Sequence, residues 1–363
     1  MKQRDADFEH NPWILLGAFG VIAVVLFVVL KLAASSDDNT AAHDATPTAA
    51  TTSTVPDESA AAPLSPQGIP TPTGALKPGQ LEKRLRQKLD AGPSLLTTDG
   101  PLGRLSYPVG RAVGGDLTTA VANIPNRTGD AGWVSSMHML EANHPDFITL
   151  NEVGRHSTAG IDAVAPGYTA YRDPTPDHSR GAASQVMNNV VLYRSSEWRK
   201  LDGGRLRVVN DDSGFLHGHA FVWDRFITWT LLQRPSDGAI VSVASLHMPT
   251  NPAKYPTQHG RVGESRVARY SQGMDVVLDV VRQLEQYGPV LMGGDMNSHP
   301  GQGPWTAAAK MASAGFSYAK DTGVIYLFFP RSATVVGHHD VPVVSDHPAL
   351  VASLAMNGSG PAR

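Results

Sequence analysis

Two polar clusters in the second half of the chain each border an apolar run. Gly293-Gly294-Asp295-Met296-Asn297 follows the apolar residues 290–292, and Ser345-Asp346-His347-Pro348 comes directly before a second run at residues 349–354. Carboxylate and carboxamide oxygens are ligands that hard divalent cations prefer, and imidazole moves protons. Such side chains at neighbouring strand ends can bind a cation and act on phosphate. The two clusters therefore indicate metal-assisted phosphate chemistry.

Polar residues terminate apolar runs at seven positions, which are Asn123, Glu152, His247, Asp295, Asn297, Asp346 and His347. Taken singly, each would more often be solvated or structural than functional. A phosphodiester resists attack because its anionic oxygens repel the nucleophile and its leaving alkoxide is poor. A divalent cation offsets both effects, and a base orients or deprotonates water. Glu152 suits the cation, His347 suits a base or a phosphate ligand, and His247 can stabilise charge in the transition state.

The elements that must position these residues begin near residue 115. Short apolar and β-branched runs predict strands at residues 118–124, 147–150, 190–193, 226–233 and 239–246. The last two are predicted to form an antiparallel pair that turns at residues 235–238. Helical spacing predicts one helix through Trp133, Met137 and Leu140. It predicts a second at residues 265–287, whose apolar face consists of Val277, Leu278, Val281 and Leu284.

This mixture of strands and helices predicts an α/β (α+β) sandwich rather than a doubly wound parallel sheet. The sequence holds no glycine fingerprint for dinucleotides or nucleoside triphosphates, so no nucleotide cofactor is expected. There is no cysteine, which excludes disulfides and thiolate metal sites. From residue 115 onward, the chain contains 20 Lys and Arg and 22 Asp and Glu. That balance gives no electrostatic argument for nucleic-acid binding, although it does not exclude an enzyme that binds nucleic acid through a metal ion.

A resemblance to a known superfamily rests on four segments, which are Leu150-Asn151-Glu152-Val153, Ser245-Leu246-His247-Met248-Pro249-Thr250, Gly294-Asp295-Met296-Asn297-Ser298 and Ser345-Asp346-His347-Pro348. In this order they resemble the signatures of the endonuclease/exonuclease/phosphatase superfamily, and Val121-Ala122-Asn123-Ile124 is similar to its first-strand motif. The resemblance covers roughly residues 115–356. It implies a deoxyribonuclease I-like fold, with two packed mixed β-sheets flanked by helices.

The same resemblance implies roles for individual residues. Glu152 would bind Mg²⁺ (or Mn²⁺), with Asn123 and Asp346 close to the ion. Asp295 and Asn297 would position or activate the attacking water, and His247 and His347 would hold the phosphate. Thr250 lies where the superfamily often contacts a phosphate oxygen.

One position departs from the superfamily pattern. Members usually carry an Ile-Asp-Tyr-like motif whose Asp pairs with the histidine of the Ser-Asp-His motif, whereas the nearest match here has Ile325 in the Asp position. Because such a partner normally sets an imidazole's tautomer, His347 needs another one, and Asp321 and Asp340 are the candidates. His338-His339-Asp340 could alternatively form a second metal cluster, although an ordinary polar turn before a strand is commoner.

The N-terminal region has a different character. Residues 14–30 are uncharged and apolar, and the span 13–34 would be about 33 Å long as a helix, enough to cross a bilayer core. The run exceeds the usual core of a signal peptide, which favours a retained anchor over a cleaved signal or a buried helix. Lys2 and Arg4 precede the span, and the 45 residues 32–76 that follow Lys31 hold no Lys or Arg. This pattern predicts a cytoplasmic N-terminus and an extracytoplasmic catalytic domain, although Asp5, Asp7 and Glu9 dilute it.

The expected organisation has six segments. They are a cytoplasmic tail (1–12), a transmembrane anchor (13–34), a disordered linker rich in Ala, Thr, Ser and Pro (35–76), a linker-proximal segment with a short helix (77–114), the catalytic domain (115–356) and a disordered tail (357–363). The linker has too few apolar residues to offset its ordering entropy. In the short helix, Leu81, Leu85 and Leu89 share one face, which favours docking onto the domain over contact with the membrane surface.

The leading hypothesis is a membrane-tethered, divalent-metal-dependent phosphoesterase, a nuclease among the possibilities. Its partner would be a phosphate-ester substrate, whether nucleic acid, phospholipid or a small phosphoester. Alternatives are a phospholipid or sphingomyelin-type phosphodiesterase, and a non-catalytic scaffold that kept the fold, the latter motivated by Ile325. In a nuclease, Arg261, Arg266 and Arg269 could line a basic groove, although on a helix they would more often be solvated. Nothing in the sequence indicates an oligomeric state.

Overall fold

The computed structural model describes residues 95–175, 187–210, 212–216, 219–259 and 263–358. Compactness divides the chain into two units, Met1–Ala75 and Leu76–Arg363, and every described residue belongs to the second. The predicted anchor (13–34), linker (35–76) and short helix (81–89) lie outside the described residues. None of the helices in the described ranges is long and apolar enough to cross a membrane.

Two large mixed β-sheets form the framework of the second unit. The seven-stranded sheet consists of β3 (Arg111–Ala112), β8 (Arg199–Val209), β11 (Arg225–Arg234), β12 (Ala239–His247), β13 (Val290–Asp295), β14 (Phe316–Lys320) and β15 (Ile325–Pro330). The six-stranded sheet consists of β4 (Gly114–Asn123), β5 (Phe147–Asn151), β6 (Tyr168–Tyr171), β7 (Val190–Arg194), β16 (Thr334–Val341) and β17 (Ala349–Asn357). Two antiparallel hairpins accompany them, formed by β1 (Leu95–Thr98) with β2 (Leu105–Pro108) and by β9 (Asp212–Leu216) with β10 (His219–Val222).

The strand order explains where the functional ends lie. It is β14-β15-β13-β12-β11-β8 in the first sheet, with β3 on β12, and β16-β17-β4-β5-β7-β6 in the second. The neighbours β4 and β5 are parallel, and so are β12 and β13. Asn123 is in register with Asn151, and His247 with Asp295. Because parallel neighbouring strands end at the same edge of their sheet, the polar residues at the ends of each pair lie side by side.

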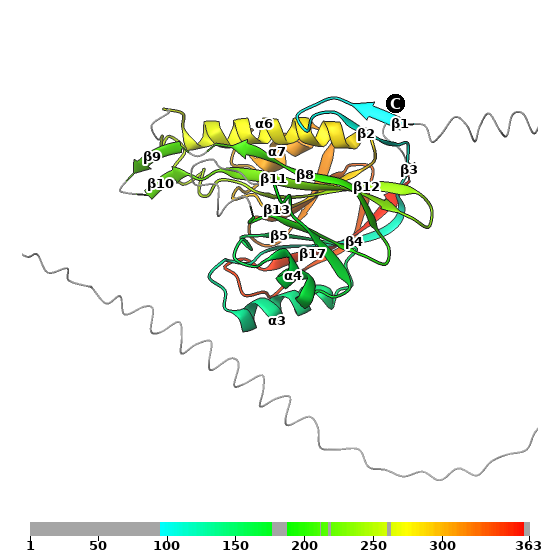
Figure 1. The fold of residues 1–363 in the computed structure, drawn as a ribbon. Helices are drawn as coiled ribbons and strands as arrows, with labels where there is room; N and C mark the ends of the chain where they lie inside the picture. Colours follow the sequence, from blue (N-terminus) through cyan, green and yellow to red (C-terminus); the bar gives the residue numbers. More distant parts are fainter. Residues whose placement is uncertain (1–94, 176–186, 211, 217–218, 260–262, 359–363) are drawn as a thin grey trace, which may run out of the picture. The chain divides into compact units, whose positions relative to one another are not determined.

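The layers are stacked as helix, sheet, sheet, helix (Figure 1). Helices α6 (Arg266–Glu285) and α7 (Ala307–Ser313) cover the outer face of the seven-stranded sheet, and α3 (Asp130–Glu141) and α4 (Thr158–Val164) cover that of the six-stranded sheet. Three buried apolar clusters fill the three interfaces. The middle cluster joins the two sheets through residues such as Val121 and Leu291. The predicted sandwich of mixed sheets flanked by helices is therefore confirmed.

Helix α6 follows its sequence pattern closely. Its first residue comes after Ser265, whose hydroxyl accepts a hydrogen bond from the Ala268 N–H and so caps the helix. The four predicted apolar residues, Val277, Leu278, Val281 and Leu284, are all buried against the sheet. Burial of that face, more than intrinsic propensity, stabilises a helix in a folded domain. The helix then leads through a short turn into β13, one of the strands that carries the site.

Two glycines let the sandwich close near the site. A Cβ on Gly293 would overlap the Thr149 hydroxyl and the Val121 side chain, both on the opposite sheet. A Cβ on Gly294 would overlap the carbonyl oxygen of Leu246 on the neighbouring strand. Any side chain at either position would push the strands or the sheets apart. The Gly293-Gly294 pair therefore brings Asp295 within reach of residues on the other sheet.

Strand β8 was not predicted from the sequence. It contains the adjacent pair Gly203-Gly204 among charged residues, and glycine disfavours strands. In the structure, a Cβ on Gly203 would lie 2.7 Å from the ring of Tyr171, and one on Gly204 would lie 3.0 Å from the indole of Trp229. Aromatic side chains thus lie over the glycines and supply the packing that the strand lacks. Long-range packing of this kind leaves no local pattern in the sequence.

Candidate active site

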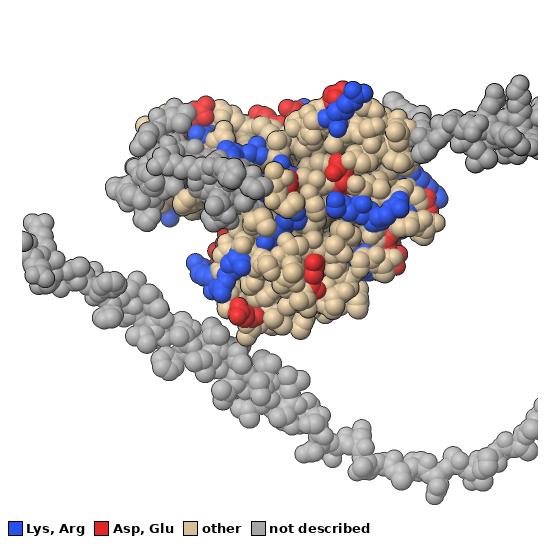
Figure 2. All heavy atoms as spheres, viewed as in Figure 1, with Lys and Arg blue, Asp and Glu red and all other residues tan. Residues whose placement is uncertain are grey.

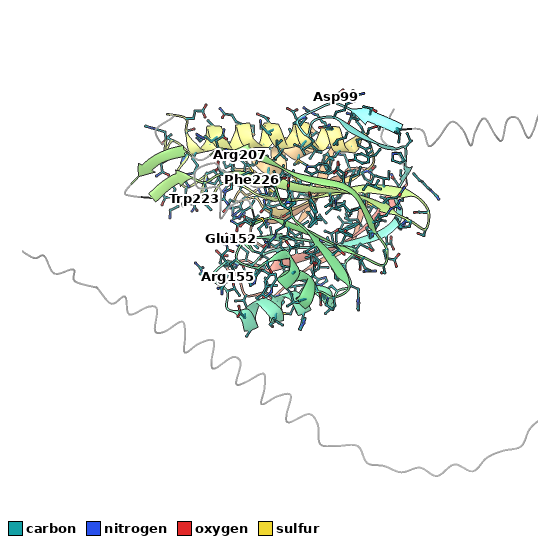
Figure 3. All side chains as sticks on the ribbon, in the orientation of Figure 1. Asp99, Glu152, Arg155, Arg207, Trp223 and Phe226 are labelled. Carbon is teal, nitrogen blue, oxygen red and sulfur yellow. The ribbon has the colours of Figure 1, made fainter. Side chains whose placement is uncertain are left out.

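Four polar side chains meet at one edge of the sandwich. Asn123 ends β4 and Glu152 follows β5, both in the six-stranded sheet, whereas His247 ends β12 and Asp295 ends β13 in the seven-stranded sheet. Figure 3 shows Glu152 at this edge, between the two sheets. Asn123, His247 and Asp295 are buried, and Glu152 is partly exposed. The site is therefore assembled from both sheets, with one carboxylate reaching toward solvent.

Asn123 links the two carboxylates. Its Nδ2 donates hydrogen bonds to Oε1 of Glu152 at 3.2 Å and to Oδ2 of Asp295 at 3.0 Å. Its Oδ1 is buried and has no hydrogen-bond partner among the described residues. An amide oxygen left without a donor inside a protein is costly unless something else binds it. Asn123 thus holds the carboxylates in place and presents a free acceptor beside them.

His247 faces the same two carboxylates. Its Nε2 lies 3.8 Å from Oδ2 of Asp295 and 4.0 Å from Oε1 of Glu152. Neither ring nitrogen makes a hydrogen bond within the part of the chain that the structure describes. Burial lowers the pKa of His247 well below its ordinary value, and the positive charges of Arg225 and His347 lower it further. The imidazole is therefore neutral at neutral pH, with one N–H to donate and one nitrogen to accept.

Asp295 is the most constrained residue of the group. Its N–H donates to Oδ1 of Asn151 at 2.8 Å, its carbonyl oxygen accepts from the Met248 N–H at 3.0 Å, and its Oδ1 accepts from the Asn297 N–H at 2.9 Å. Burial raises the pKa of Asp295 to about 6, an effect that the hydrogen bonds to its carboxylate from Asn297 and Asn123 and the charges of His347 and Arg225 reduce but do not cancel. A carboxylate with a pKa near the working pH suits a group that accepts and returns a proton.

Two site residues have backbone conformations that side chains rarely adopt. Glu152 has a φ of 60° and Asn297 a φ of 48°, both in the left-handed region. Asparagine tolerates this region, whereas for glutamate it is uncommon and costs free energy. Strained backbone of this kind often accompanies functional positions, where the surroundings hold it in place. Asn297 is further held by a hydrogen bond from its Nδ2 to the carbonyl oxygen of Met248 at 3.1 Å.

Asn151 supports the site from beneath, a role that was not predicted from the sequence. Its side chain is fully buried, and its Oδ1 accepts from the Asp295 N–H. Its Nδ2 donates to Oδ1 of Asn189 at 3.0 Å and to Oγ of Ser245 at 3.1 Å. Ser245 in turn donates to the carbonyl oxygen of Leu150 at 2.9 Å. This buried polar network ties β5, β12 and β13 together under the site, and the only sequence signal for it was that Asn151 precedes Glu152.

The segment after β5 is anchored separately. The buried guanidinium of Arg172 donates to the carbonyl oxygens of His156 at 2.6 Å and Val153 at 2.8 Å. Oδ1 of Asn188 accepts from the Gly154 N–H at 3.1 Å. The ring of His156 stacks on Trp133 with centroids 4.1 Å apart. These contacts fix the turn that carries Glu152 and its positive φ.

Arg225 is a site residue that sequence reasoning missed. It is only 7 % exposed, and its Nε has no hydrogen-bond partner within the described part of the chain. Burial lowers the pKa of Arg225 to about 10, and the negative charges of Asp295 and Glu152 act in the opposite direction. A buried guanidinium N–H without an acceptor is costly, so an anionic ligand is expected to supply one. The available sequence signal was its position at the start of β11, the strand that runs beside β12.

The remaining predicted residues are less closely tied to the four. The side chain of Asp346 is 65 % exposed. Within the described residues, no hydrogen bond or ion pair joins Asp346 to Glu152 or Asn123. Its Oδ2 lies 3.9 Å from Nε2 of His347, whose charge acts on both Asp295 and His247. Thr250 is exposed, and the contact found for it is through its carbonyl oxygen, which accepts from Arg266 at 2.6 Å.

Solved structures of other proteins share this architecture. The structure resembles an endonuclease/exonuclease/phosphatase family protein from Bacteroides thetaiotaomicron with a TM-score of 0.52 and 13% sequence identity, covering 68% of this chain and 97% of that one. It also resembles a mannosyl-6-phosphatase from the VPI-5482 strain of the same species, with a TM-score of 0.50, 13% identity, and coverage of 66% of this chain and 100% of that one. No protein-family model matches the sequence, and no curated protein matches it.

This chain has the deoxyribonuclease I-like fold.

In this deoxyribonuclease I-like fold, the edge of the sandwich offers part of a donor set for a divalent cation. Among the described residues, no three His, Asp or Glu side chains converge in a way that could hold a metal by themselves, and this includes His338, His339 and Asp340. Mg²⁺, however, is usually held by one or two carboxylates together with water and substrate phosphate. The Glu152 carboxylate and the free, buried Oδ1 of Asn123 fit that pattern.

Proposed function

We propose that this chain is a membrane-tethered, divalent-metal-dependent phosphoesterase. The observation that carries the proposal is the cluster of Asn123, Glu152, His247 and Asp295, joined across two sheets and retaining unsatisfied polar atoms. The fold supports it as well, since one structure of the same fold is named as a phosphatase. A purely structural cluster would satisfy its buried polar atoms internally, whereas a site keeps them for a ligand.

The metal would be held by Glu152 and Oδ1 of Asn123, with Asp346 assigned to it from the sequence. Mg²⁺ or Mn²⁺ suits these oxygen donors. When bound, such a cation polarises a phosphoryl oxygen and offsets the charge that develops there. The Nδ2 group of Asn123 keeps the Glu152 carboxylate oriented, so the ligand set needs little rearrangement on binding.

The chain's own residues would carry the proton transfers. Asp295, oriented by Asn123 and by the Asn297 N–H, accepts a proton from the attacking water as the water oxygen bonds to phosphorus. The bond from phosphorus to the leaving oxygen breaks in the same step. Neutral His247 donates its N–H to a phosphoryl oxygen, and Asn297 orients the water.

Arg225 and His347 would hold the substrate phosphate. The Arg225 guanidinium presents several N–H donors in a plane, which matches two phosphoryl oxygens at once. His347 in its protonated form, which carries an N–H on both ring nitrogens, and, more peripherally, Thr250 supply further donors, as the sequence suggests. Binding the phosphate would give the buried Nε of Arg225 a hydrogen-bond acceptor.

Two classes of phosphoester are the candidate substrates for this site. Figure 2 shows Lys and Arg side chains near the edge where Figure 3 places Glu152 and Arg155, although Asp and Glu are interspersed over the face. A phosphodiester such as nucleic acid is the first candidate because Arg155 and Arg207 lie on this side of the molecule. A phospholipid is the second candidate, favoured by the exposed indole of Trp223, which is 44 % accessible and two residues from Arg225.

The test is hydrolysis by the full chain in detergent with Mg²⁺ or Mn²⁺. The panel comprises bis-p-nitrophenyl phosphate, p-nitrophenyl phosphate, DNA, RNA, sphingomyelin and inositol phosphates. Asp295→Asn and His247→Ala are expected to lose activity, whereas Asp279→Asn, an exposed change on α6, is expected to keep it. Equal activity in all variants would overturn the site assignment. Absence of both hydrolysis and Mg²⁺ binding would favour the scaffold alternative.

The membrane tether has its own test. The apolar run at residues 13–34 motivates it. We expect the full chain to sediment with membranes after high-salt washing and a chain lacking residues 1–34 to stay in the supernatant. Protease applied outside intact cells or spheroplasts should digest the catalytic domain. Protection of that domain would reverse the proposed orientation, and loss of the first residues from the mature chain would indicate a cleaved signal.

A further inference from the structure

His347 approaches a buried carboxylate that the sequence pattern does not assign to it. Its Nδ1 lies 3.0 Å from the position that a Cβ on Gly323 would occupy, and Oδ2 of Asp321 lies 3.0 Å from that same position. The two polar atoms therefore border one small space that exists because residue 323 has no side chain. No direct hydrogen bond joins them in the described structure.

The Asp321 carboxylate is held in place through only one of its two oxygens. Its Oδ1 accepts from the Ile325 N–H at 2.9 Å, and its backbone N–H donates to the carbonyl oxygen of Ile325 at 3.0 Å. The Nζ of Lys320 donates to the carbonyl oxygens of Asp321 at 2.7 Å and Gly323 at 3.2 Å, which closes the turn. Asp321 is 4 % exposed, and its Oδ2 is buried and has no hydrogen-bond partner in the described ranges. A buried carboxylate oxygen of this kind is expected to accept a hydrogen bond.

Ile325 cannot play this part. It is fully buried in the apolar cluster between the two sheets, at the first position of β15. Asp340, the other candidate, is exposed on the edge strand β16. Of the two carboxylates considered from the sequence, only Asp321 has both the burial and the approach to Nδ1 of His347.

We propose that Asp321 is the positioning residue for His347. Its Oδ2 accepts a hydrogen bond that originates at Nδ1–H, either through one bridging water or directly after a small rotation of the imidazole into the space beside Gly323. That hydrogen bond selects the tautomer in which Nε2 is the free nitrogen on the far side of the ring. The carboxylate that the superfamily pattern would have at the start of β15 therefore lies in the turn before that strand. Gly323 is required because any side chain at this position would separate Asp321 from His347.

The first experiment measures the tautomer directly and does not depend on activity. In metal-free full-length protein at a pH where His347 is neutral, ¹⁵N chemical shifts of its two ring nitrogens are recorded by NMR. The wild type is expected to show a protonated Nδ1 and an unprotonated Nε2. Asp321→Asn and Gly323→Ala are expected to shift the pair toward averaged values. Asp340→Asn and Gly337→Ala serve as matched controls, since a Cβ on Gly337 meets nothing within 4 Å.

The second experiment rests on the proposed function. Asp321→Asn and Gly323→Ala are expected to lower kcat by about 10- to 100-fold with KM changed less than threefold, while the two controls stay within about twofold. Asp321→Glu should recover part of the loss, because a purely structural role for the turn would not favour a carboxylate. Unchanged ¹⁵N shifts in both variants would overturn the proposal. If no substrate is hydrolysed at all, the proposed function fails while the NMR result still decides the pairing. Thermal melts identify any variant that fails to fold, and Gly323→Ala then stands in for Asp321→Asn.

Discussion

Asn123 and Asp295 hydrogen-bond to each other across the interface of two different sheets. The distance from Nδ2 to Oδ2 is 3.0 Å, although 172 residues separate the two in the chain. Asn123 ends β4 in one sheet and Asp295 ends β13 in the other. Neither sheet alone can form the site, so its geometry depends on the packing between them.

The first prediction concerns Asn123. Asn123→Ala should weaken Mg²⁺ binding by about tenfold or more, because it removes a ligand oxygen and releases the Glu152 carboxylate. Isothermal titration calorimetry on the full chain measures the affinity. Asn143→Ala, which changes a half-buried asparagine just after α3, is the matched control and should bind Mg²⁺ like the wild type. Equal affinity in both variants would remove Asn123 from the metal site.

The second prediction concerns removal of the metal. Mg²⁺ at about 100 times its dissociation constant should raise Tm by about 5–10 °C over protein in EDTA, because a ligand that binds only the folded state stabilises it. Glu152→Gln should lose most of that shift, whereas Glu197→Gln, an exposed change in a turn, should keep it. Differential scanning calorimetry makes the comparison. A full shift in Glu152→Gln would mean that the cation binds elsewhere.

The third prediction concerns pH. Burial raises the folded-state pKa of Asp295 to about 6, from an ordinary value of 3.8. The folded protein therefore holds this proton more tightly than the unfolded chain, so the stabilisation is fully present below pH 3.8 and is lost as pH rises through about 6. In metal-free protein the loss should be on the order of 2–3 kcal/mol. The check is the difference in unfolding free energy between wild type and Asp295→Asn at several pH values in EDTA. A difference that does not vary with pH would contradict the assignment.

The fourth prediction concerns the network beneath the site. Asn151→Ala should lower the free energy of unfolding by about 2–4 kcal/mol, because it leaves several buried polar groups without partners. Ser245→Ala removes a smaller part of the network and should cost about 1 kcal/mol. Urea denaturation measures both. If the two substitutions cost the same, Asn151 is not the centre of the network.

The fifth prediction concerns Arg225. Arg225→Gln should raise KM for a phosphoester substrate by about 10- to 100-fold, and Arg225→Lys should recover only part of the loss, because an ammonium cannot contact two oxygens in a plane. Arg282→Gln, a largely exposed change on α6, is the control. Inhibition by vanadate should weaken in parallel. A normal KM in Arg225→Gln would place the phosphate elsewhere.

The framework and part of the site could be predicted from the sequence because both leave local patterns. Apolar runs that end in polar residues marked β4, β5, β12 and β13, and the structure brings Asn123, Glu152, His247 and Asp295 together at their ends. The apolar periodicity of residues 265–287 likewise located α6. These features depend on residues adjacent in the chain or one turn apart.

The rest depends on contacts between distant segments. Arg225 is a site residue only because β11, β12 and β13 lie beside one another and bury its charge near Asp295. Asn151 becomes a support only when β12 and β13 pack against it. Whether Asp321 or Asp340 serves His347 depends on the turn before β15, which the sequence does not specify. The roles of Asp346 and Thr250 stay predictions, as do the anchor and linker.

The hydrogen bond between Asn123 and Asp295 also bears on how the protein refolds. A contact that closes a loop of 172 residues forms late, because the chain must lose much conformational entropy before the contact contributes favourable free energy. Secondary structure and burial of tryptophan in each sheet can therefore recover first. Recovery of Mg²⁺ binding would follow as a separate, slower phase, and it would report the moment at which the two sheets dock.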